Sequence, residues 1–359
     1  KRNTGRSKSK GGNGTPGGMA STRKCIRSLA EGRSPQEDIL AAAEEVVTGQ
    51  ATPAQVGALL VLLTIDRVDA QTLGAFVDVC MRLSRPCALS DYPDLCDVVG
   101  TGGDGKDTFN CSTTASFILA ATGLRVAKHG NRSSSGSFGS ADLLEALGAD
   151  LGMDPERVAR VFDACGFAFL FAPAFHPAFK NIAQARKDVG VRTIFNALGP
   201  LINPARPAHQ VIGVGDPRLG PLFASYFSTR RMPALIVHGT DGLDEVSCEA
   251  VTDYWRINAD GTVERGTLTP EVFGVPPSPL AEVCDVGGAT ERLRMFWDVM
   301  EGRECAAFRF VVMNAACVLV AAGRADTWQA GYDAAAIAVR SGKAAALVRA
   351  YVAATQAGN

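Results

Sequence analysis

The sequence lacks the hallmarks of membrane, disulfide-bonded and nucleic-acid-binding proteins. No uninterrupted apolar run reaches the roughly 18 residues of a membrane-spanning helix, and the closest, Phe308 to Ala322, contains Arg309 and Asn314. The net charge of −1 gives no general attraction for a polyanion. The ten cysteines are scattered without a C-x-x-C pair, which favours free thiols over disulfides or zinc. We therefore expect a cytoplasmic protein with no nucleic-acid or membrane partner.

The first 33 residues contain few apolar and few acidic side chains. Lysine and arginine occur there among Gly, Ser, Thr and Asn, and the first acidic residue is Glu31. Such a composition cannot build a core, so we predict a disordered basic tail over residues 1–33. The alternative is an organelle transit segment, which would place the protein in the plastid stroma. Because the chain starts at Lys1, we also expect the printed sequence to be trimmed or incomplete.

Residues 34–90 have helical periodicity. Apolar residues recur at spacings of three and four from Ile39 to Val47. A capping box at Thr52-Pro53-Ala54-Gln55 precedes a helix that is apolar almost all round, and a third helix is expected at about 70–83. Because such helices need cover on several faces, we predict a small helical domain that forms a homodimer surface.

Strand and helix patterns alternate after Arg85-Pro86. This alternation predicts an α/β domain with a mostly parallel central sheet over residues 91–359. Residues 172–180 are expected to form an irregular loop, and helices around 175–190 could pack with the helical domain. Strands are predicted at about 95–99, 124–127, 167–171, 210–213 and 234–237, with a β-ribbon around 253–266.

Glycine- and serine-rich loops follow the first two predicted strands. The first runs from Gly100 to Gly105, and the second from Lys128 to Gly136, each before a predicted helix. Glycines let backbone N–H groups turn inward, and helix N-termini add a positive dipole end. Two such loops side by side favour a multiply phosphorylated ligand over a simple pair of turns.

Two common nucleotide-binding motifs do not fit these loops. Gly100, Gly102 and Gly105 match the dinucleotide fingerprint, but no acidic residue for the ribose occurs between Asp107 and Asp142. No Gly-Lys-Ser/Thr closes a Walker loop. A nicotinamide or P-loop site is therefore disfavoured.

An acidic pair follows a later strand. Asp244-Glu245 lies just past the strand at 234–237, where sites of α/β proteins usually lie. The pair could be a solvated acidic turn, but carboxylates beside phosphate-binding loops suit Mg²⁺. Asp104 and Ser112 could supply further oxygens.

We interpret the histidine and arginine side chains as residues that line a binding site and not as general acids or bases. We interpret His129, alone in a glycine-rich loop, as a hydrogen-bonding wall. One interpretation of Arg186 and Lys187 is that both are solvated cations at a helix C-terminus. The alternative is that the Arg186 guanidinium binds a carboxylate through two parallel hydrogen bonds.

Taken together, the ordered motifs closely resemble those of anthranilate phosphoribosyltransferases of tryptophan biosynthesis. The resemblance runs from about Asp38 to the C-terminus. It implies a homodimer with the two-domain architecture predicted above, and transfer of the phosphoribosyl group of phosphoribosyl pyrophosphate (PRPP) to the amino group of anthranilate, with Mg²⁺. It is carried by Gly100-Thr101-Gly102-Gly103-Asp104, Asn110-Cys111-Ser112-Thr113, Lys128-His129-Gly130-Asn131-Arg132, the segment 195–204 and Asp241-Gly242-Leu243-Asp244-Glu245.

The resemblance also implies roles for individual residues. Anthranilate would contact Gly100, Asn131 and Arg186, in a channel walled by His129, Pro173, His176 and Phe179. Mg²⁺ would be held by Ser112, Asp244 and Glu245. PRPP would be bound by Gly100, Gly103, Asp104, Thr108, Asn110, Cys111, Ser112, Thr113, Lys128, His129, Gly130, Asn131, Arg132, Ser133, Ser134, Ser135, Gly136 and Ser140.

We expect catalysis by positioning and electrostatics, through Lys128, Asn131 and Arg186, without an essential acid or base. Two departures from the family pattern are Cys111, where an aliphatic residue is usual, and Phe138, where small polar residues are common. A bulky Phe138 is expected to alter the second loop. The alternative functions are a nucleoside phosphorylase of the same fold and a non-catalytic relative that binds nucleic acid.

Overall fold

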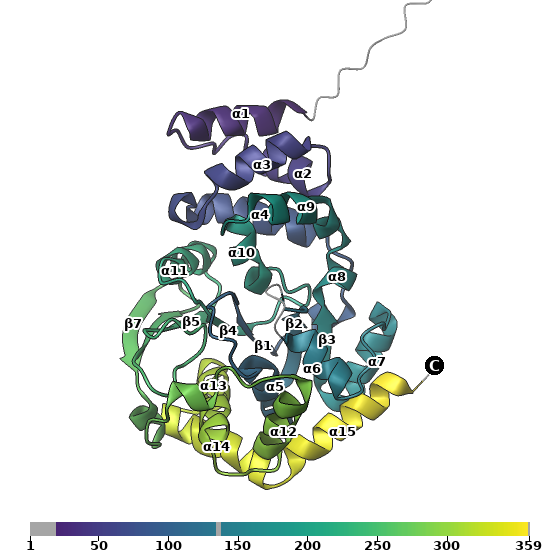
Figure 1. Cartoon of the computed structure of the whole chain (residues 1–359), viewed down its shortest axis with the longest axis vertical. Helices are drawn as coiled ribbons and strands as arrows, with labels where there is room; N and C mark the ends of the chain where they lie inside the picture. The colour runs from purple at the N-terminus through teal and green to yellow at the C-terminus, as the bar shows by residue number, and fades with distance from the viewer. Residues whose placement is uncertain (1–18, 134–137, 358–359) are drawn as a thin grey trace, which may run out of the picture.

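A small helical part sits on a larger α/β part, with the two stacked along the long axis of the molecule (Figure 1). The computed structural model describes residues 19–133 and 138–357. The helical part is formed by α1 (Met19–Ala30), α2 (Ile39–Val47), α3 (Pro53–Leu62) and α4 (Ala70–Arg82), together with α9 (Lys180–Val189) and α10 (Ile194–Leu198) from much later in the chain. The predicted capping box of α3 is confirmed, since the side chains of Thr52 and Gln55 each bond the other's backbone N–H.

Residues 19–30 correct the predicted tail. They form α1, in which Thr22 and Cys25 are fully buried while Arg23, Lys24 and Arg27 face outward. The carboxylate of the buried Glu45 on α2 accepts the backbone N–H of Thr22 at 2.9 Å, which caps the first turn. The disordered-tail prediction is therefore wrong for residues 19–30, because a few inward side chains and a distant cap suffice to dock an otherwise basic helix. Residues 1–18 lie outside the described residues.

A seven-stranded sheet forms the centre of the α/β part, as the alternating pattern predicted. Its strand order is β3-β2-β1-β4-β5-β6-β7. The first five strands are parallel, and β6 and β7 add an antiparallel ribbon at one edge. The strands are β1 (Leu95–Gly100), β2 (Arg125–Gly130), β3 (Phe167–Phe171), β4 (His209–Gly213), β5 (Ala234–Gly239), β6 (Thr252–Ile257) and β7 (Val263–Leu268).

Helices cover both faces of this sheet (Figure 1). The segment 172–180 is not irregular, because it contains α8 (Ala172–Phe175) and a short 3-10 turn at Pro177–Phe179. Two helices, α11 (Leu219–Arg230) and α15 (Lys343–Gln356), were not predicted from the sequence. The remaining helices are α5 (Cys111–Ala121), α6 (Ser140–Ala146), α7 (Pro155–Cys165), α12 (Ala289–Met300), α13 (Ala306–Ala321) and α14 (Trp328–Arg340).

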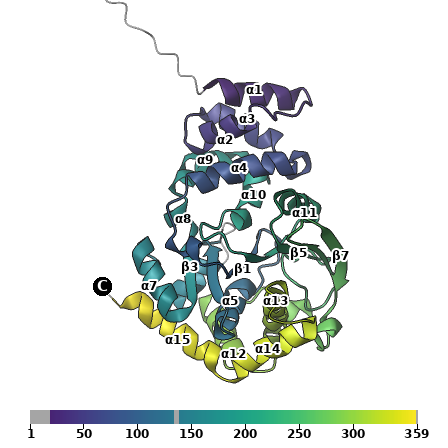
Figure 2. The ribbon, with the colours of Figure 1, turned by 180° about the vertical axis from the view of Figure 1, so that it is seen from behind.

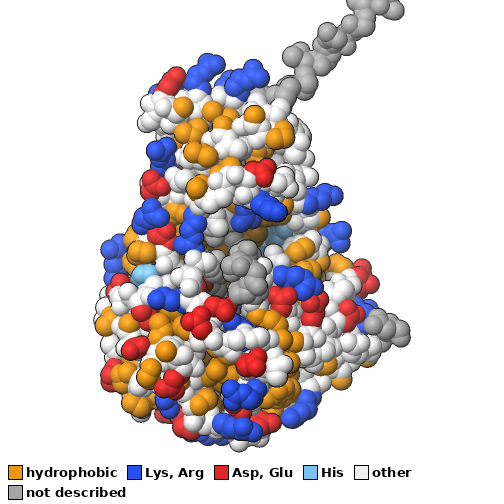
Figure 3. Space-filling model, in the orientation of Figure 1, with side chains coloured by type: hydrophobic (Ala, Val, Ile, Leu, Met, Phe, Trp, Pro, Cys, Tyr) orange, Lys and Arg blue, Asp and Glu red, His pale blue; other side chains and the backbone are white. Residues whose placement is uncertain are grey.

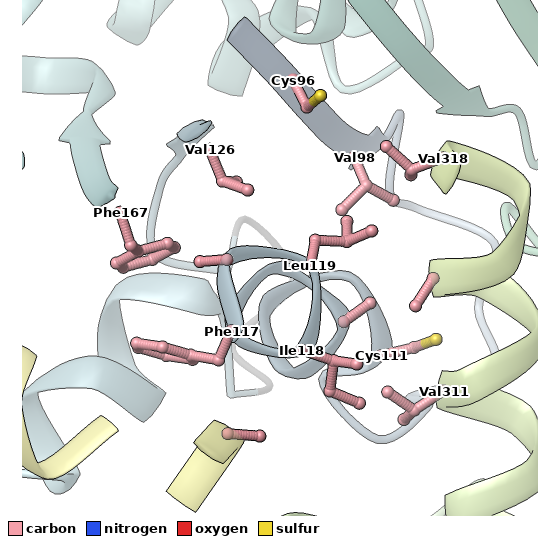
Figure 4. Close-up of a cluster of buried hydrophobic side chains, with 14 of the residues drawn as sticks. Cys96, Val98, Cys111, Phe117, Ile118, Leu119, Val126, Phe167, Val311 and Val318 are labelled. Atoms are coloured by element: carbon pink, nitrogen blue, oxygen red, sulfur yellow. The ribbon is translucent and has the colours of Figure 1, made fainter. Parts of the chain in front are cut away.

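Alternating side chains of the central strands divide the interior into two cores. Val211 and Leu235 face the core that contains α5 and α13, whereas Ile212 and Ile236 face the core that contains α11 and the helical part. Figure 4 shows α5 end-on in the first core, with Phe117, Ile118 and Leu119 pointing toward neighbouring strands and helices. Fully burying side chains of this kind contributes about 1.5–3 kcal/mol each. The same packing fixes the start of α5 relative to the sheet.

Helix α9 brings a late segment of the chain back to the helical part (Figure 2). It packs against α2 and α3, and its Ile182 is fully buried in their core. The Asn181 side chain donates to the Val47 carbonyl at 2.9 Å. The C-terminal residues of α9 consequently face the ends of the parallel strands across a gap between the two parts.

Within residues 19–133 and 138–357, none of the helices combines the length and apolar character that crossing a bilayer requires.

Candidate active site

A cleft of about 1100 Å³ lies between the helical part and the carboxyl ends of the parallel strands. Because these strands run in one direction, the segments that follow them meet at the same edge of the sheet. Both glycine-rich loops, the acidic pair and Arg186 line the cleft, as do the predicted wall residues. Figure 3 shows Lys and Arg side chains on the face of the molecule where the two parts meet.

One described residue assigned to substrate lies off the cleft. Thr113 is fully buried and does not line it. A helix turns by about 100° per residue, so the position after Ser112 points into the protein. The other described residues predicted for substrate or metal all line the cleft, and Ser134, Ser135 and Gly136 lie outside the described residues.

In the structure the first loop comprises residues 101–110, between β1 and α5, and the described part of the second loop comprises residues 131–133, 138 and 139, between β2 and α6. Close backbone packing holds the first loop against the acidic pair. The N–H of Gly102 donates to Asp244 Oδ2 at 2.6 Å. A Cβ on Gly100 would overlap the Asp244 carboxylate, and one on Gly213 would overlap its backbone oxygen. Arg192 donates to the carbonyls of Gly102 and Gly103 at 3.0 and 2.5 Å. The loop is thus clamped between strand ends and a residue that follows α9.

Three carboxylates gather at the centre of the site. Oxygens of Asp104, Asp244 and Glu245 lie within 4.8 Å of one another. Burial raises the pKa of all three groups, and their mutual repulsion adds to the effect for Asp244 and Glu245. Asp104 Oδ2 and Glu245 Oε2 are buried and have no hydrogen-bond partner among the described residues. This arrangement is unfavourable unless a cation or protons offset the negative charge.

Lys128 lies beneath this cluster rather than open to solvent. Its fully buried ammonium group donates to the Val98 carbonyl at 2.7 Å and to Ser112 Oγ at 3.1 Å. Burial lowers the pKa of Lys128, and the nearby Asp97 opposes that change. Asp97 is itself held by Asn203 at 2.8 Å, and burial raises its pKa to about 6. Lys128 therefore orients Ser112 and links β1 to β2.

The described part of the second loop is tied to α6 and to the first loop. The Arg132 guanidinium donates to Glu145 and Asp142 at 2.5 and 3.0 Å, so those two carboxylates already engage it. Asn110 Nδ2 of the first loop donates to the Phe138 carbonyl at 2.8 Å. The two loops are in direct contact through this bond.

Two histidines line the cleft in neutral, fixed orientations. His129 Nδ1 is 3.2 Å from the Gly199 carbonyl, and His176 Nε2 is 2.8 Å from the Ile202 carbonyl. Each carbonyl accepts a hydrogen bond, so the other ring nitrogen of His129 is a buried acceptor with no partner among the described residues. Burial lowers the pKa of His129 to about 3, and neighbouring His176 adds to that shift.

Arg186 faces the loops from the helical side of the cleft. Among the described residues, no acidic side chain forms an ion pair with it, and its guanidinium carbon lies 5.9 Å from the centre of the Phe195 ring. Partial burial lowers the pKa of the guanidinium. An unneutralised arginine over an aromatic ring is suited to an aromatic carboxylate.

Two arginines that hold the loops were missed from the sequence. Arg192 clamps the first loop, and Arg292 on α12 is buried beneath both loops. Neither lies in a glycine-rich motif. Nothing in the local pattern of α12 distinguishes the buried Arg292 from the exposed Arg294.

Comparison with known proteins gives consistent matches along the chain. Residues 92–345 match the family described as glycosyl transferase family, a/b domain, and residues 23–84 match its helical bundle domain. The chain is 43% identical to the anthranilate phosphoribosyltransferase of Moorella thermoacetica over 86% of this chain and 90% of that protein. It is 40% identical to that of Mycobacterium marinum over 87% and 86%, respectively.

Solved structures agree with the sequence matches. The anthranilate phosphoribosyltransferase of Thermus thermophilus aligns with a TM-score of 0.86 and 35% identity, covering 93% of this chain and all of that one. The Saccharomyces cerevisiae enzyme in complex with PRPP and Mg aligns with a TM-score of 0.85 and 26% identity, covering 94% and 98%. With two glycine-rich loops, a carboxylate cluster and an unpaired arginine in one cleft, this chain belongs to the anthranilate phosphoribosyltransferase family.

Proposed function

We propose that this chain transfers the phosphoribosyl group of PRPP to the amino group of anthranilate, giving N-(5-phosphoribosyl)anthranilate and pyrophosphate in tryptophan biosynthesis. The observation that carries this proposal is the convergence of two anion-binding loops and three unneutralised carboxylates on one side of a cleft. Arg186 lies across from them, where it would meet an aromatic acid. Neither alternative function has comparable support from the site or from the relatives.

The carboxylate cluster fits Mg²⁺. Asp104, Asp244 and Glu245 offer hard oxygen ligands, and two of their oxygens are buried without a partner. Ser112 Oγ already accepts from Lys128, and we assign it a supporting position at the edge of the metal site. When bound, Mg²⁺ would neutralise charge on the pyrophosphate group, and this chain's residues would hold it at the strand ends.

The two loops would bind the phosphate groups of PRPP. Residues of the first loop and the start of α5 line the cleft, and a helix N-terminus favours anions. Asn131 and Ser140 line the same side from the second loop. PRPP would therefore lie with its anomeric carbon facing α9.

The chemistry requires little from acid or base groups. The aromatic amine of anthranilate is neutral at pH 7, and pyrophosphate leaves once its developing charge is stabilised. Arg186 would hold the anthranilate carboxylate and so direct the amine toward the anomeric carbon. The neutral His129 can accept a hydrogen bond but cannot act as an acid near pH 7.

We also propose that the helical part mediates a homodimer. Leu40 on α2 and Val61 on α3 are half exposed, at 50% and 51%. A second copy of the chain docked on the helical part would remove these aliphatic side chains from water.

The reaction itself is tested by the loss of anthranilate fluorescence when purified protein is mixed with PRPP. We expect the fluorescence to fall with Mg²⁺ and to stay constant when Mg²⁺ is chelated, because the carboxylates cannot bind pyrophosphate without a cation. Constant fluorescence with Mg²⁺ and intact substrates would contradict the proposed function.

Arg186→Gln should weaken anthranilate binding selectively. Loss of a charge-assisted bond to a carboxylate costs about 1.5–3 kcal/mol, so KM for anthranilate should rise roughly 10- to 100-fold, while KM for PRPP changes little. Steady-state kinetics with each substrate varied would measure both. The exposed neighbour Lys187→Gln is the control and should resemble wild type. An unchanged anthranilate KM in Arg186→Gln would refute the assignment.

His129→Asn should keep most of the turnover and leave the pH profile unaltered. Because the pKa of His129 is lowered to about 3, the ring is uncharged in the folded protein both above and below pH 6.5. Its protonation therefore cannot reduce kcat between pH 8 and pH 6, and asparagine can preserve the bond to Gly199. An acidic limb near pH 6.5 in wild type that disappears in His129→Asn would show that the histidine acts as a base.

A further inference from the structure

Arg292 is a buried arginine outside the substrate-binding motifs. Its side chain is only 1% exposed, although it lies on α12, about 180 residues after the first loop. Burying a guanidinium is costly unless its donors are satisfied. Its partners therefore indicate what the residue is for.

All three guanidinium nitrogens of Arg292 have a partner. Nε donates to the Gly287 carbonyl at 3.1 Å, and Nη1 donates to the Thr108 carbonyl at 2.9 Å. Nη2 lies 2.8 Å from the Asp107 carboxylate and 3.4 Å from the Asp107 carbonyl. Three of these four contacts are to the first loop.

Residues 107–109, next to which Arg292 lies, depend on distant residues for their backbone conformation. Asp107 has a φ of +45°, in the left-handed region that non-glycine residues seldom adopt. The N–H of the following Phe109 donates to the Val283 carbonyl at 2.8 Å, again to a distant segment. The end of the first loop thus takes its conformation from residues 283–292.

Arg292 also touches the second loop. Its guanidinium carbon lies 5.9 Å from the centre of the Phe138 ring, while the Phe138 carbonyl accepts from Asn110. The helix that carries Arg292 packs against both α5 and α6, which begin where the two loops end. The Phe138 ring therefore lies near Arg292 while its backbone is bonded to Asn110.

We propose that Arg292 is a positioning residue that fixes the two glycine-rich loops relative to each other, with Asp107 and Phe138 as its partners. This arrangement lets both loops bind the same PRPP molecule. This inference rests on the proposed function. Its consequence is selective: loss of the link should weaken PRPP binding more than anthranilate binding, because the anthranilate carboxylate would be held across the cleft by Arg186 on α9.

The test measures the dissociation constant of PRPP by calorimetry with Mg²⁺ and without anthranilate, alongside anthranilate KM at saturating PRPP. Arg292→Met should weaken PRPP binding on the order of 10-fold or more, Arg292→Lys should weaken it less, and anthranilate KM should stay within about twofold. Phe138→Ala should weaken PRPP binding in the same direction. Arg294→Met on the same helix is the control, because Arg294 is exposed and pairs only with Asp298 among the described residues.

The variant Asp107→Asn tests the positioning role of Arg292 if the Arg292 variants do not fold. Asparagine tolerates the left-handed backbone and keeps a side-chain oxygen that can accept from Arg292, but it removes the charge that neutralises the buried guanidinium. The protein should therefore fold with a lowered melting temperature, while its PRPP affinity falls severalfold and its anthranilate KM stays near that of wild type. Wild-type PRPP affinity in Asp107→Asn, or equal loss of both substrates together with a lowered melting temperature in Arg292→Lys, would overturn the inference. Failure of wild type itself to bind PRPP would overturn the proposed function as well, which separates the two failures.

Discussion

The site depends on three carboxylates, one buried and two partly buried, that are held together against their mutual repulsion. Asp104, Asp244 and Glu245 lie within 4.8 Å of one another, and two of their oxygens have no hydrogen-bond partner. Such a cluster lowers stability unless the rest of the fold and a bound cation offset it. The fold contributes the backbone N–H groups of Gly102 and Lys106 and the nearby ammonium of Lys128, and a divalent cation would supply the remainder.

The architecture brings the carboxylates and both glycine-rich loops to one edge of the sheet. Parallel strands deliver both loops and the acidic pair to the same end of the sheet. Gly100 and Gly213 provide the space that Asp244 occupies. Helix α9 then returns to the helical part and places Arg186 opposite the loops. One side of the cleft thus suits phosphates and a metal, and the other an aromatic carboxylate.

The sequence predicted those parts of the molecule whose signals are local. Strand runs, the capping box at Thr52 and the α/β class are encoded in neighbouring residues, and the structure agrees with them. Helix α1 was missed because its cap is Glu45, more than twenty residues away. Arg292 was missed because burial of one arginine on an amphipathic helix depends on distant loops. Thr113 was assigned by motif, and helix geometry turns it inward.

We propose that the carboxylate cluster binds a cation at the expense of stability, and Asp244→Asn tests this proposal most directly. Asparagine can still accept from the Gly102 N–H, but it removes one buried charge. Calorimetric titration of Mg²⁺ in the presence of PRPP should show affinity reduced at least about tenfold, while the metal-free melting temperature stays the same or rises. Unchanged Mg²⁺ affinity, or a metal-free protein several degrees less stable, would contradict the account.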